Sequence, residues 1–121
     1  MKIFISPSEE SKVIIEANFL RGIILSKWPD ATINDVEDQN RPFVMEWNIQ
    51  KGEEYLNGKL DRKEDMIVFE FSSIELAANF SVWIFSNLQS KNDIIMYNDS
   101  YSVVLPLSLT TTSFAIIDAF S

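Results

Sequence analysis

Apolar and polar residues alternate over the first positions of the chain and then change to a helical spacing. Ile3 and Ile5 alternate with their neighbours, which is typical of a short strand. Ser6-Pro7-Ser8-Glu9 then matches a capping box, with Ser6 at the N-cap and Pro7 at the first helical position. The predicted helix ends before Pro29. Its apolar positions are Val13, Ile14, Ile15, Ala17, Phe19, Leu20, Ile23, Ile24, Leu25 and Trp28.

A polar segment follows, and then a clear strand. Residues 30–41 are polar and acidic, with Ile33 and Val36 as the apolar exceptions, so we expect a loop or a loop with a short edge strand. After Pro42 the residues alternate strictly, as expected when one face of a sheet is buried and the other meets water. The side predicted to face the core carries Phe43, Met45, Trp47 and Ile49.

Two dipeptides can close a hairpin after this strand. Lys51-Gly52 and Asn57-Gly58 both fit a turn. We prefer Lys51-Gly52, because the next strand then points Leu56 and Leu60 inward. The polar run 61–65 predicts a further turn before an apolar strand, so residues 42–71 together form a three-stranded meander.

The second half of the chain repeats the alternation of helix and strands. Ser72-Ser73-Ile74-Glu75 is a second capping-box signature, and it predicts a helix from Ser73 to about Gln89. Two strands at 93–97 and 101–107 flank the turn Asn98-Asp99-Ser100. The segment Thr110–Ser113 can cap a last short helix, whose predicted apolar face carries Phe114, Ile117 and Phe120.

These elements predict one α+β domain over residues 1–121, in the order β-α-(β)β-β-β-α-β-β-α. Runs of consecutive strands between helices favour a mainly antiparallel sheet with two principal helices packed on one face. A ferredoxin-like arrangement and a meander flanked by helices both fit this order.

The charge of the chain excludes some partners. Eighteen acidic and ten basic residues give a formal charge of −8 over 121 residues. Nucleic-acid binding draws on clustered cations, as does binding to an anionic membrane surface, so we expect neither. The apolar N-terminal run is too short for a signal peptide and no stretch is long enough to span a membrane, which predicts a cytoplasmic protein.

The residues that the chain lacks exclude more chemistry. It has no cysteine and no histidine. Thiol redox chemistry, cysteine nucleophiles and the Ser-His-Asp arrangement are therefore ruled out. Zinc, copper and non-haem iron sites are disfavoured for the same reason. We expect a protein that is not an enzyme and that carries no cofactor and no metal site.

The acidic cluster Asp35, Glu37 and Asp38 is the first candidate site. It lacks the glycine of a calcium-binding loop, so a solvated loop is the ordinary interpretation. A contact for a basic partner protein is the functional one. Glu46 and Glu70 each stand among apolar neighbours within a strand, on the side that we expect to face solvent.

The distribution of charge suggests a second surface. Residues 66–121 contain one basic and five acidic residues, so this half either supplies most of the core or exposes an apolar patch. We expect both, with self-association as a homodimer through the apolar second helix at Phe80, Trp83 and Phe85.

Two functions from different classes follow. The first is an acidic cytoplasmic protein-interaction domain, an inhibitor, antidote or regulatory partner of a basic protein. The alternative is a small-molecule-binding or carboxylate-dependent catalytic domain, with an aromatic-lined pocket between sheet and helices. The polar groups of that pocket would be Glu46, Glu70, Tyr97 and Tyr101.

Overall fold

Seven strands form one antiparallel sheet in the part of the chain that the computed structural model describes, residues 1–8, 15–88 and 93–121. The strands are β1 (Lys2–Pro7), β2 (Thr32–Asp35), β3 (Phe43–Lys51), β4 (Glu54–Asp61), β5 (Ile67–Phe71), β6 (Ile94–Asn98) and β7 (Val104–Pro106). Their order across the sheet is β2-β3-β4-β5-β1-β6-β7. The predicted meander is therefore confirmed as β3-β4-β5, and the short edge strand as β2.

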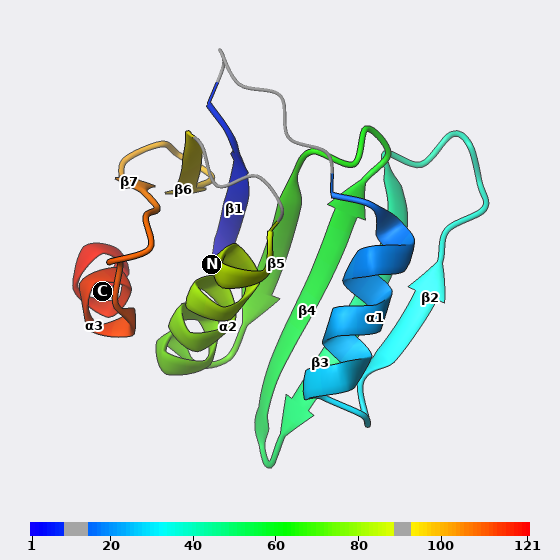
Figure 1. Cartoon of the computed structure of the whole chain (residues 1–121), viewed down its shortest axis with the longest axis horizontal. Helices are drawn as coiled ribbons and strands as arrows, with labels where there is room; N and C mark the ends of the chain where they lie inside the picture. The colour runs from blue at the N-terminus through cyan, green and yellow to red at the C-terminus, as the bar shows by residue number, and fades with distance from the viewer. Residues whose placement is uncertain (9–14, 89–92) are drawn as a thin grey trace.

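Helices cover one face of this sheet (Figure 1). The described residues form α1 (Ala17–Lys27), α2 (Ile74–Asn87) and α3 (Ser113–Phe120). In Figure 1 α1 and α2 lie across the sheet, and α3 packs beside α2. The predicted α+β class, with two principal helices on one face, is confirmed.

Strand β1 lies inside the sheet, between β5 and β6. The chain leaves β1 through α1, builds the edge of the sheet from β2 inward to β5, and returns through α2 to β6 on the other side of β1. A strand inserted between two others in this way is the split β-α-β motif. The fold thus contains both predicted arrangements. The split motif lies around β1, and β2, β3, β4 and β5 form a four-stranded meander beside it.

The core fills the space between sheet and helices. Alternate residues of the strands point toward the helices, and α1 and α2 contribute the facing side chains. The buried set includes Ile3, Ile5, Met45, Trp47, Ile49, Leu56, Leu60 and Phe69 from the sheet, with Leu20, Ile24, Phe80 and Ile84 from the helices. The interface expected to hold an aromatic-lined pocket is therefore packed with side chains.

The first helix begins later than the sequence predicts. Ser6 and Pro7, expected at the N-cap and the first helical position, are the last residues of β1 and pair with β6; Glu9 lies outside the described residues. Helix α1 begins at Ala17, whose backbone N–H donates to Glu64 Oε2 at 2.8 Å. A carboxylate from the β4–β5 turn therefore caps the positive end of this helix.

The other helices differ from prediction in smaller ways. Ser73 caps α2 by accepting from the N–H of Leu76 at 3.3 Å, as expected. In α3 Phe114 is 80% exposed, and Ile116 packs inward in its place. Leu25 of α1, expected to be buried, is exposed. Val13 and Ile14 of the first predicted helix, and Gln89 at the predicted end of the second, lie outside the described residues.

The sheet contains one close approach that the sequence does not indicate. The hairpin turn lies one residue beyond the predicted Lys51-Gly52, at Gly52 and Glu53, because Lys51 ends β3 and pairs with Glu54. Gly52 has a φ of +63°. Asn57-Gly58 is not a turn, because both residues lie inside β4. Gly58 is the cross-strand partner of Trp47. A Cβ at Gly58 would lie 2.5 Å from the indole Nε1 and closer still to Cε2 and Cζ2. The indole therefore needs a glycine beneath it.

The first residue of β3 also departs from prediction. Phe43, expected on the core side with Met45, precedes an irregularity in the pairing between β3 and β4. An extra residue of this kind shifts the side chains beyond it to the other face. The Phe43 ring accordingly lies under the ammonium of Lys59, 5.0 Å from its centroid, on the side of the sheet that the helices leave uncovered.

Candidate functional site

The side of the sheet away from the helices, the open face, carries two rows of side chains that cross several strands. Paired residues in neighbouring strands lie side by side, about 5 Å apart. One row consists of Thr32, Asn48, Asn57, Glu70 and Lys2. The second row consists of Asn34, Glu46, Lys59, Val68 and Phe4.

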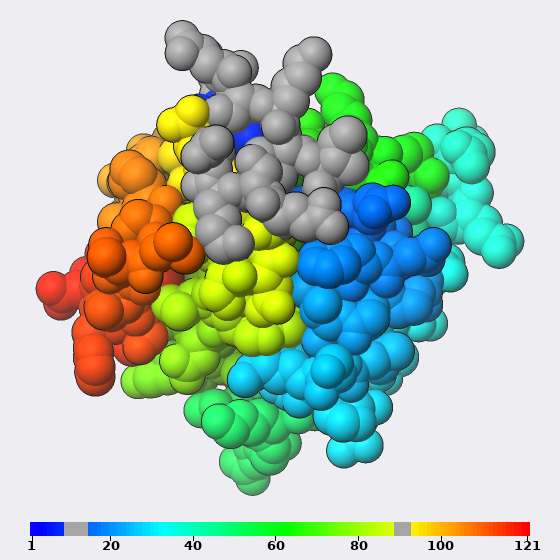
Figure 2. Space-filling view, in the orientation of Figure 1, coloured from blue at the N-terminus to red at the C-terminus, as the bar shows by residue number. Residues whose placement is uncertain are grey.

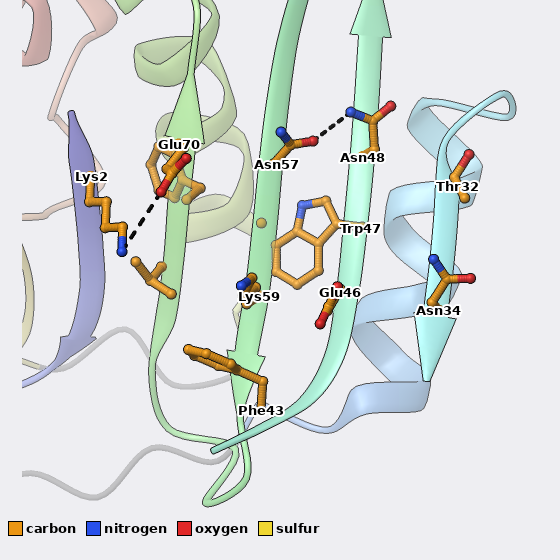
Figure 3. Close-up of a pocket in the computed structure, with 13 residues that line it drawn as sticks. Lys2, Thr32, Asn34, Phe43, Glu46, Trp47, Asn48, Asn57, Lys59 and Glu70 are labelled. Atoms are coloured by element: carbon orange, nitrogen blue, oxygen red, sulfur yellow. Dashed lines mark hydrogen bonds and ion pairs between the residues drawn. The ribbon is translucent and has the colours of Figure 1, made fainter. Parts of the chain in front are cut away.

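A pocket of about 400 Å³ lies over the polar part of these rows (Figure 3). Its floor comes from β1 to β5, and amide side chains of Asn34, Asn48 and Asn57 are prominent in its lining. Phe43 borders one end of it. The lining also includes the aromatic residues Trp47 and Phe69. The pocket is therefore a mixed polar and apolar surface on the sheet, and not the cavity predicted between sheet and helices.

Three of the four charged side chains that line this pocket form ion pairs, and the fourth, Lys59, lies over the Phe43 ring. Lys2 Nζ lies 3.7 Å from Glu70 Oε1, and Arg41 donates to Glu46 Oε1 at 2.5 Å. Asn48 Nδ2 donates to Asn57 Oδ1 at 2.5 Å. The lining carries two ammonium and two carboxylate groups, so it has no net charge.

Glu46 and Glu70 line the same pocket, and both lie on the open face as predicted. They stand on β3 and β5, however, with β4 between them. Two strand spacings separate these strands by about 10 Å, too far for one carboxyl to act directly on the other. Each carboxylate instead contacts a cation. The geometry favours binding of a polar ligand over acid–base work by this pair.

Tyr97 and Tyr101 lie beyond the pocket, on the β6 side of the open face. The Tyr97 ring stacks on Phe4 at 5.3 Å between centroids and on Tyr101 at 4.8 Å. Tyr97 is buried, whereas Tyr101 is 64% exposed. Burial raises the pKa of the Tyr97 phenol, and the hydrogen bond with Ser6, at 3.1 Å, opposes that rise. The two tyrosines are therefore not brought together with Glu46 and Glu70.

The raised pKa of Tyr97 predicts a loss of stability in alkali. Above about pH 10 an unfolded tyrosine releases its proton, while the folded Tyr97 keeps it, so the native state binds more protons. The free energy of unfolding then falls as pH rises, by at most about 1.4 kcal/mol per pH unit for one group.

Tyr97→Phe should reduce this alkaline slope, as measured by urea unfolding between pH 9 and pH 11. Tyr55→Phe is the matched control, since it removes a hydroxyl from a partly exposed ring in β4. A slope that is the same in the Tyr97 variant and in the wild type would contradict the assignment.

The acidic segment joins β2 to β3 beside this pocket, and Arg62 holds it. The Arg62 side chain donates through Nε and Nη2 to four backbone carbonyls, and the backbone N–H of Arg62 donates to Pro42 O at 2.8 Å. The four carbonyl acceptors, with their distances, are Arg41 O at 3.0 Å, Val36 O at 3.2 Å, Asp38 O at 2.9 Å and Phe43 O at 2.7 Å. One cation thus fixes the path of residues 36–43, which we call the acidic loop.

The predicted acidic cluster is divided by this arrangement. Asp35 ends β2 and forms an ion pair with Arg21 of α1. Glu37 and Asp38 are exposed on the acidic loop, and Asp38 Oδ1 accepts from the N–H of Asn40 at 2.9 Å. Arg62 contacts the carbonyls of the loop and not its carboxylates. The two loop carboxylates therefore keep their charge toward solvent.

The residues predicted for self-association lie mostly inside the chain. Phe80 is fully buried and Phe85 is 4% exposed, because α2 packs against the sheet on one side and α3 on another. Neither ring can reach a second molecule, so these two assignments are wrong. Trp83 is half-buried and packs edge-on against Trp28, with 4.7 Å between ring centroids.

Sequence reasoning missed the groups that organise this region. The sequence predicts only a turn at Arg62. The residues next to it in the chain do not indicate that its guanidinium contacts four carbonyl oxygens of the acidic loop. The amides Asn48 and Asn57 could have been found, because alternation in β3 and β4 puts both on the solvent side once the turn at Gly52 is fixed.

The described part of the chain contains no group of three or more acidic side chains placed to hold a metal ion. Among the described helices, none is long and apolar enough to cross a membrane. Comparison with protein-family models, with curated proteins and with solved structures found no match to this chain.

Proposed function

We propose that this chain is a small protein-interaction domain, without catalytic activity, that binds a basic protein as its inhibitor, antidote or regulatory partner. The observation that supports this proposal most directly is the pinning of the acidic loop by Arg62. A cytoplasmic location belongs to the same proposal.

The energetics of binding explain why the pinned loop matters. Ordering a flexible segment on association costs free energy, and a segment already held in one shape avoids that cost. Four guanidinium–carbonyl hydrogen bonds hold the backbone here, while Glu37 and Asp38 stay exposed. The loop therefore offers two carboxylates, carried on a fixed backbone, to a cationic surface.

The rest of the charge distribution favours the same kind of partner. Each of the three arginines contacts the segment 35–46 of its own chain. The chain keeps a formal charge of −8, which speeds encounter with a basic protein. Attraction of this kind sets the rate and the specificity of association more than its final affinity.

The test is capture of proteins from a lysate of the source cells at low and at raised salt, with three immobilised baits. The baits are the wild type, Glu37→Gln/Asp38→Asn, and Glu53→Gln/Glu54→Gln. The two variants lose the same charge, but Glu53 and Glu54 lie at the β3–β4 hairpin, away from the acidic loop.

We expect a basic protein that the wild type and the hairpin variant capture and that the loop variant loses. Raised salt should weaken that capture, because exposed ion pairs are screened. Equal capture by the two variants, or capture that salt leaves unchanged, would overturn the assignment of the loop as the contact.

The alternative function, a small-molecule-binding domain, is supported by the 400 Å³ pocket on the open face. Its mixed donors and acceptors suit a polar, uncharged ligand. Carboxylate-dependent catalysis by Glu46 and Glu70 has less support, since each carboxylate contacts a cation.

Homodimer formation remains a separate proposal. Leu109 and Phe114 are 75% and 80% exposed in the charge-poor C-terminal segment, and apolar side chains of this size are suited to an interface. Light scattering at tens of micromolar measures the mass directly, and the mass of a single chain would refute the dimer.

A further inference from the structure

A second concave surface lies on the helix-covered side of the molecule, at the end where α1 stops. It has a volume of about 540 Å³ and is lined by Lys27, Trp28, Lys51, Asn79, Val82 and Trp83, among others. Helix α2 forms its floor, between α1 on one side and the C-terminal segment on the other (Figure 2). We call this surface the tryptophan groove. It is separate from the acidic loop and from the open face.

The walls of the groove are aromatic and aliphatic. Trp28 and Trp83 meet at 78°, with 4.7 Å between ring centroids, and Trp28 also stacks on the buried Phe80 at 6.0 Å. Packing against Phe80 fixes the Trp28 ring, while both indoles keep part of their surface exposed. Two rings held at a wide angle form a corner against which a third flat ring can pack.

The polar groups of the groove are cationic or neutral. Lys27 and Lys51 line it and no carboxylate does, although the chain carries eighteen acidic residues. Within the described residues neither lysine forms an ion pair, and the Lys27 ammonium lies 5.6 Å from the centroid of the Trp28 ring. The Asn79 side chain is exposed on α2. Two uncompensated cations beside two indoles are unexpected in so acidic a chain.

We propose that the tryptophan groove binds a small aromatic organic anion. The ring packs against Trp83 and Val82, and the acid group pairs with Lys27 and Lys51. The volume is within the range of ligand sites, and apolar walls with a few polar groups are their usual composition. The proposal does not depend on the acidic loop or on a protein partner.

The test uses 2-naphthoate as the probe and its neutral analogue 2-naphthamide as the control ligand. The indole N–H signals of the full chain, followed by NMR in 0.15 M salt, report on each tryptophan separately. Trp47 is an internal control, because it is buried between sheet and helices. We expect 2-naphthoate to shift the Trp28 and Trp83 signals, to leave Trp47 unchanged, and to bind several times more tightly than the amide.

Lysine variants test which ammonium groups bind the acid group of the probe. Lys27→Met and Lys51→Met should each weaken 2-naphthoate binding about threefold, and the double variant about tenfold, as expected for exposed ion pairs. Lys63→Met removes the same charge from the β4–β5 turn and should leave the affinity unchanged. Thermal unfolding checks that each variant is folded.

Three results would overturn the proposal. The first is the absence of shifts at Trp28 and Trp83 at 10 mM probe (a concentration far above a useful affinity). The second is equal binding of acid and amide, which would leave the lysines without a role. The third is an equal loss of 2-naphthoate affinity in the Lys63 variant, which would show that only the overall charge of the chain matters.

Discussion

Replacing Gly58 with alanine should lower the free energy of unfolding by about 3 kcal/mol, near the upper end of the cost of overpacking. The added methyl would lie 2.5 Å from the Trp47 Nε1 and closer to two other indole atoms. Trp47 is buried, and its ring packs against Phe80 with 6.2 Å between centroids. Neither the indole nor the strand can move away without disturbing the core. Urea unfolding monitored by circular dichroism measures the loss.

A second substitution separates this clash from a general effect of alanine in a strand. Trp47→Leu alone should cost about 3 kcal/mol, because it leaves a cavity. In the Gly58→Ala background the same change should cost clearly less, since the leucine makes room for the methyl. Strictly additive losses in this double-mutant cycle would contradict the clash.

Gly22→Ala is the matched control. Gly22 lies on an exposed part of α1, and a Cβ there meets nothing within 4 Å. Alanine at this position should raise stability by up to about 1 kcal/mol, through helix propensity. The same chemical change is thus expected to have opposite signs at the two glycines. Equal effects at both would exclude the packing explanation.

Replacing Arg62 with alanine should cost about 2 kcal/mol and free the acidic loop. The variant loses four hydrogen bonds from one charged group, each stronger than a neutral bond but partly replaced by water. Amide hydrogen exchange should accelerate at Val36 and Arg41, whose N–H groups bond within this region. Unchanged exchange there would show that the loop holds its shape without the guanidinium.

Two controls sharpen this prediction. Arg41→Ala removes the same charge but only an exposed ion pair with Glu46, so it should cost less than about 1 kcal/mol. Arg62→Lys keeps the charge yet cannot reach all four carbonyls, so most of the loss should remain.

The Arg62→Ala variant also tests how the proposed function depends on shape. It makes the chain more acidic, so attraction by net charge alone would strengthen capture of a basic protein. If the fixed path of the acidic loop matters, the variant binds more weakly instead. These two expectations have opposite signs, and one binding measurement decides between them.

The sheet was largely predictable because its strands follow a strict period. Alternation in β3 identified Met45, Trp47 and Ile49 as core residues, and all three are buried. The turn predicted at Lys51-Gly52 lies at Gly52 and Glu53, and the inward side of Leu56 and Leu60 was predicted correctly. Phe43 departed, because a pairing irregularity is a property of two strands and cannot be inferred from one. The strand predicted over 101–107 is also shorter, since β7 spans Val104–Pro106.

The start of α1 was not predictable because local and distant contacts compete there. Ser6 and Pro7 match a helix cap, but pairing with β6 extends the strand over both. The group that actually caps α1 is Glu64, 47 residues away from Ala17. A capping signature reports only on its own few residues, so a cap supplied by another part of the chain escapes it.

The candidate sites were also predictable where the local pattern decides and not where distant contacts decide. Glu46 and Glu70 were placed correctly on the open face, since their side follows from alternation. Their separation by β4 required the strand order. Phe80 and Phe85 were misjudged because an apolar helix has the same sequence pattern whether its own chain or another molecule covers it. Here the chain itself covers it: Phe80 packs against Trp47 and Phe69 of the sheet, and α3 packs beside α2.

The central position of β1 has a consequence for synthesis. Its hydrogen-bonding neighbours are residues 67–71 and 94–98, which the ribosome adds long after β1 itself. At about 5–20 residues per second, the first strand waits several seconds before either flank exists. The sheet cannot close around β1 until residues 94–98 have also emerged, so this apolar strand has at least one unpaired edge up to that point.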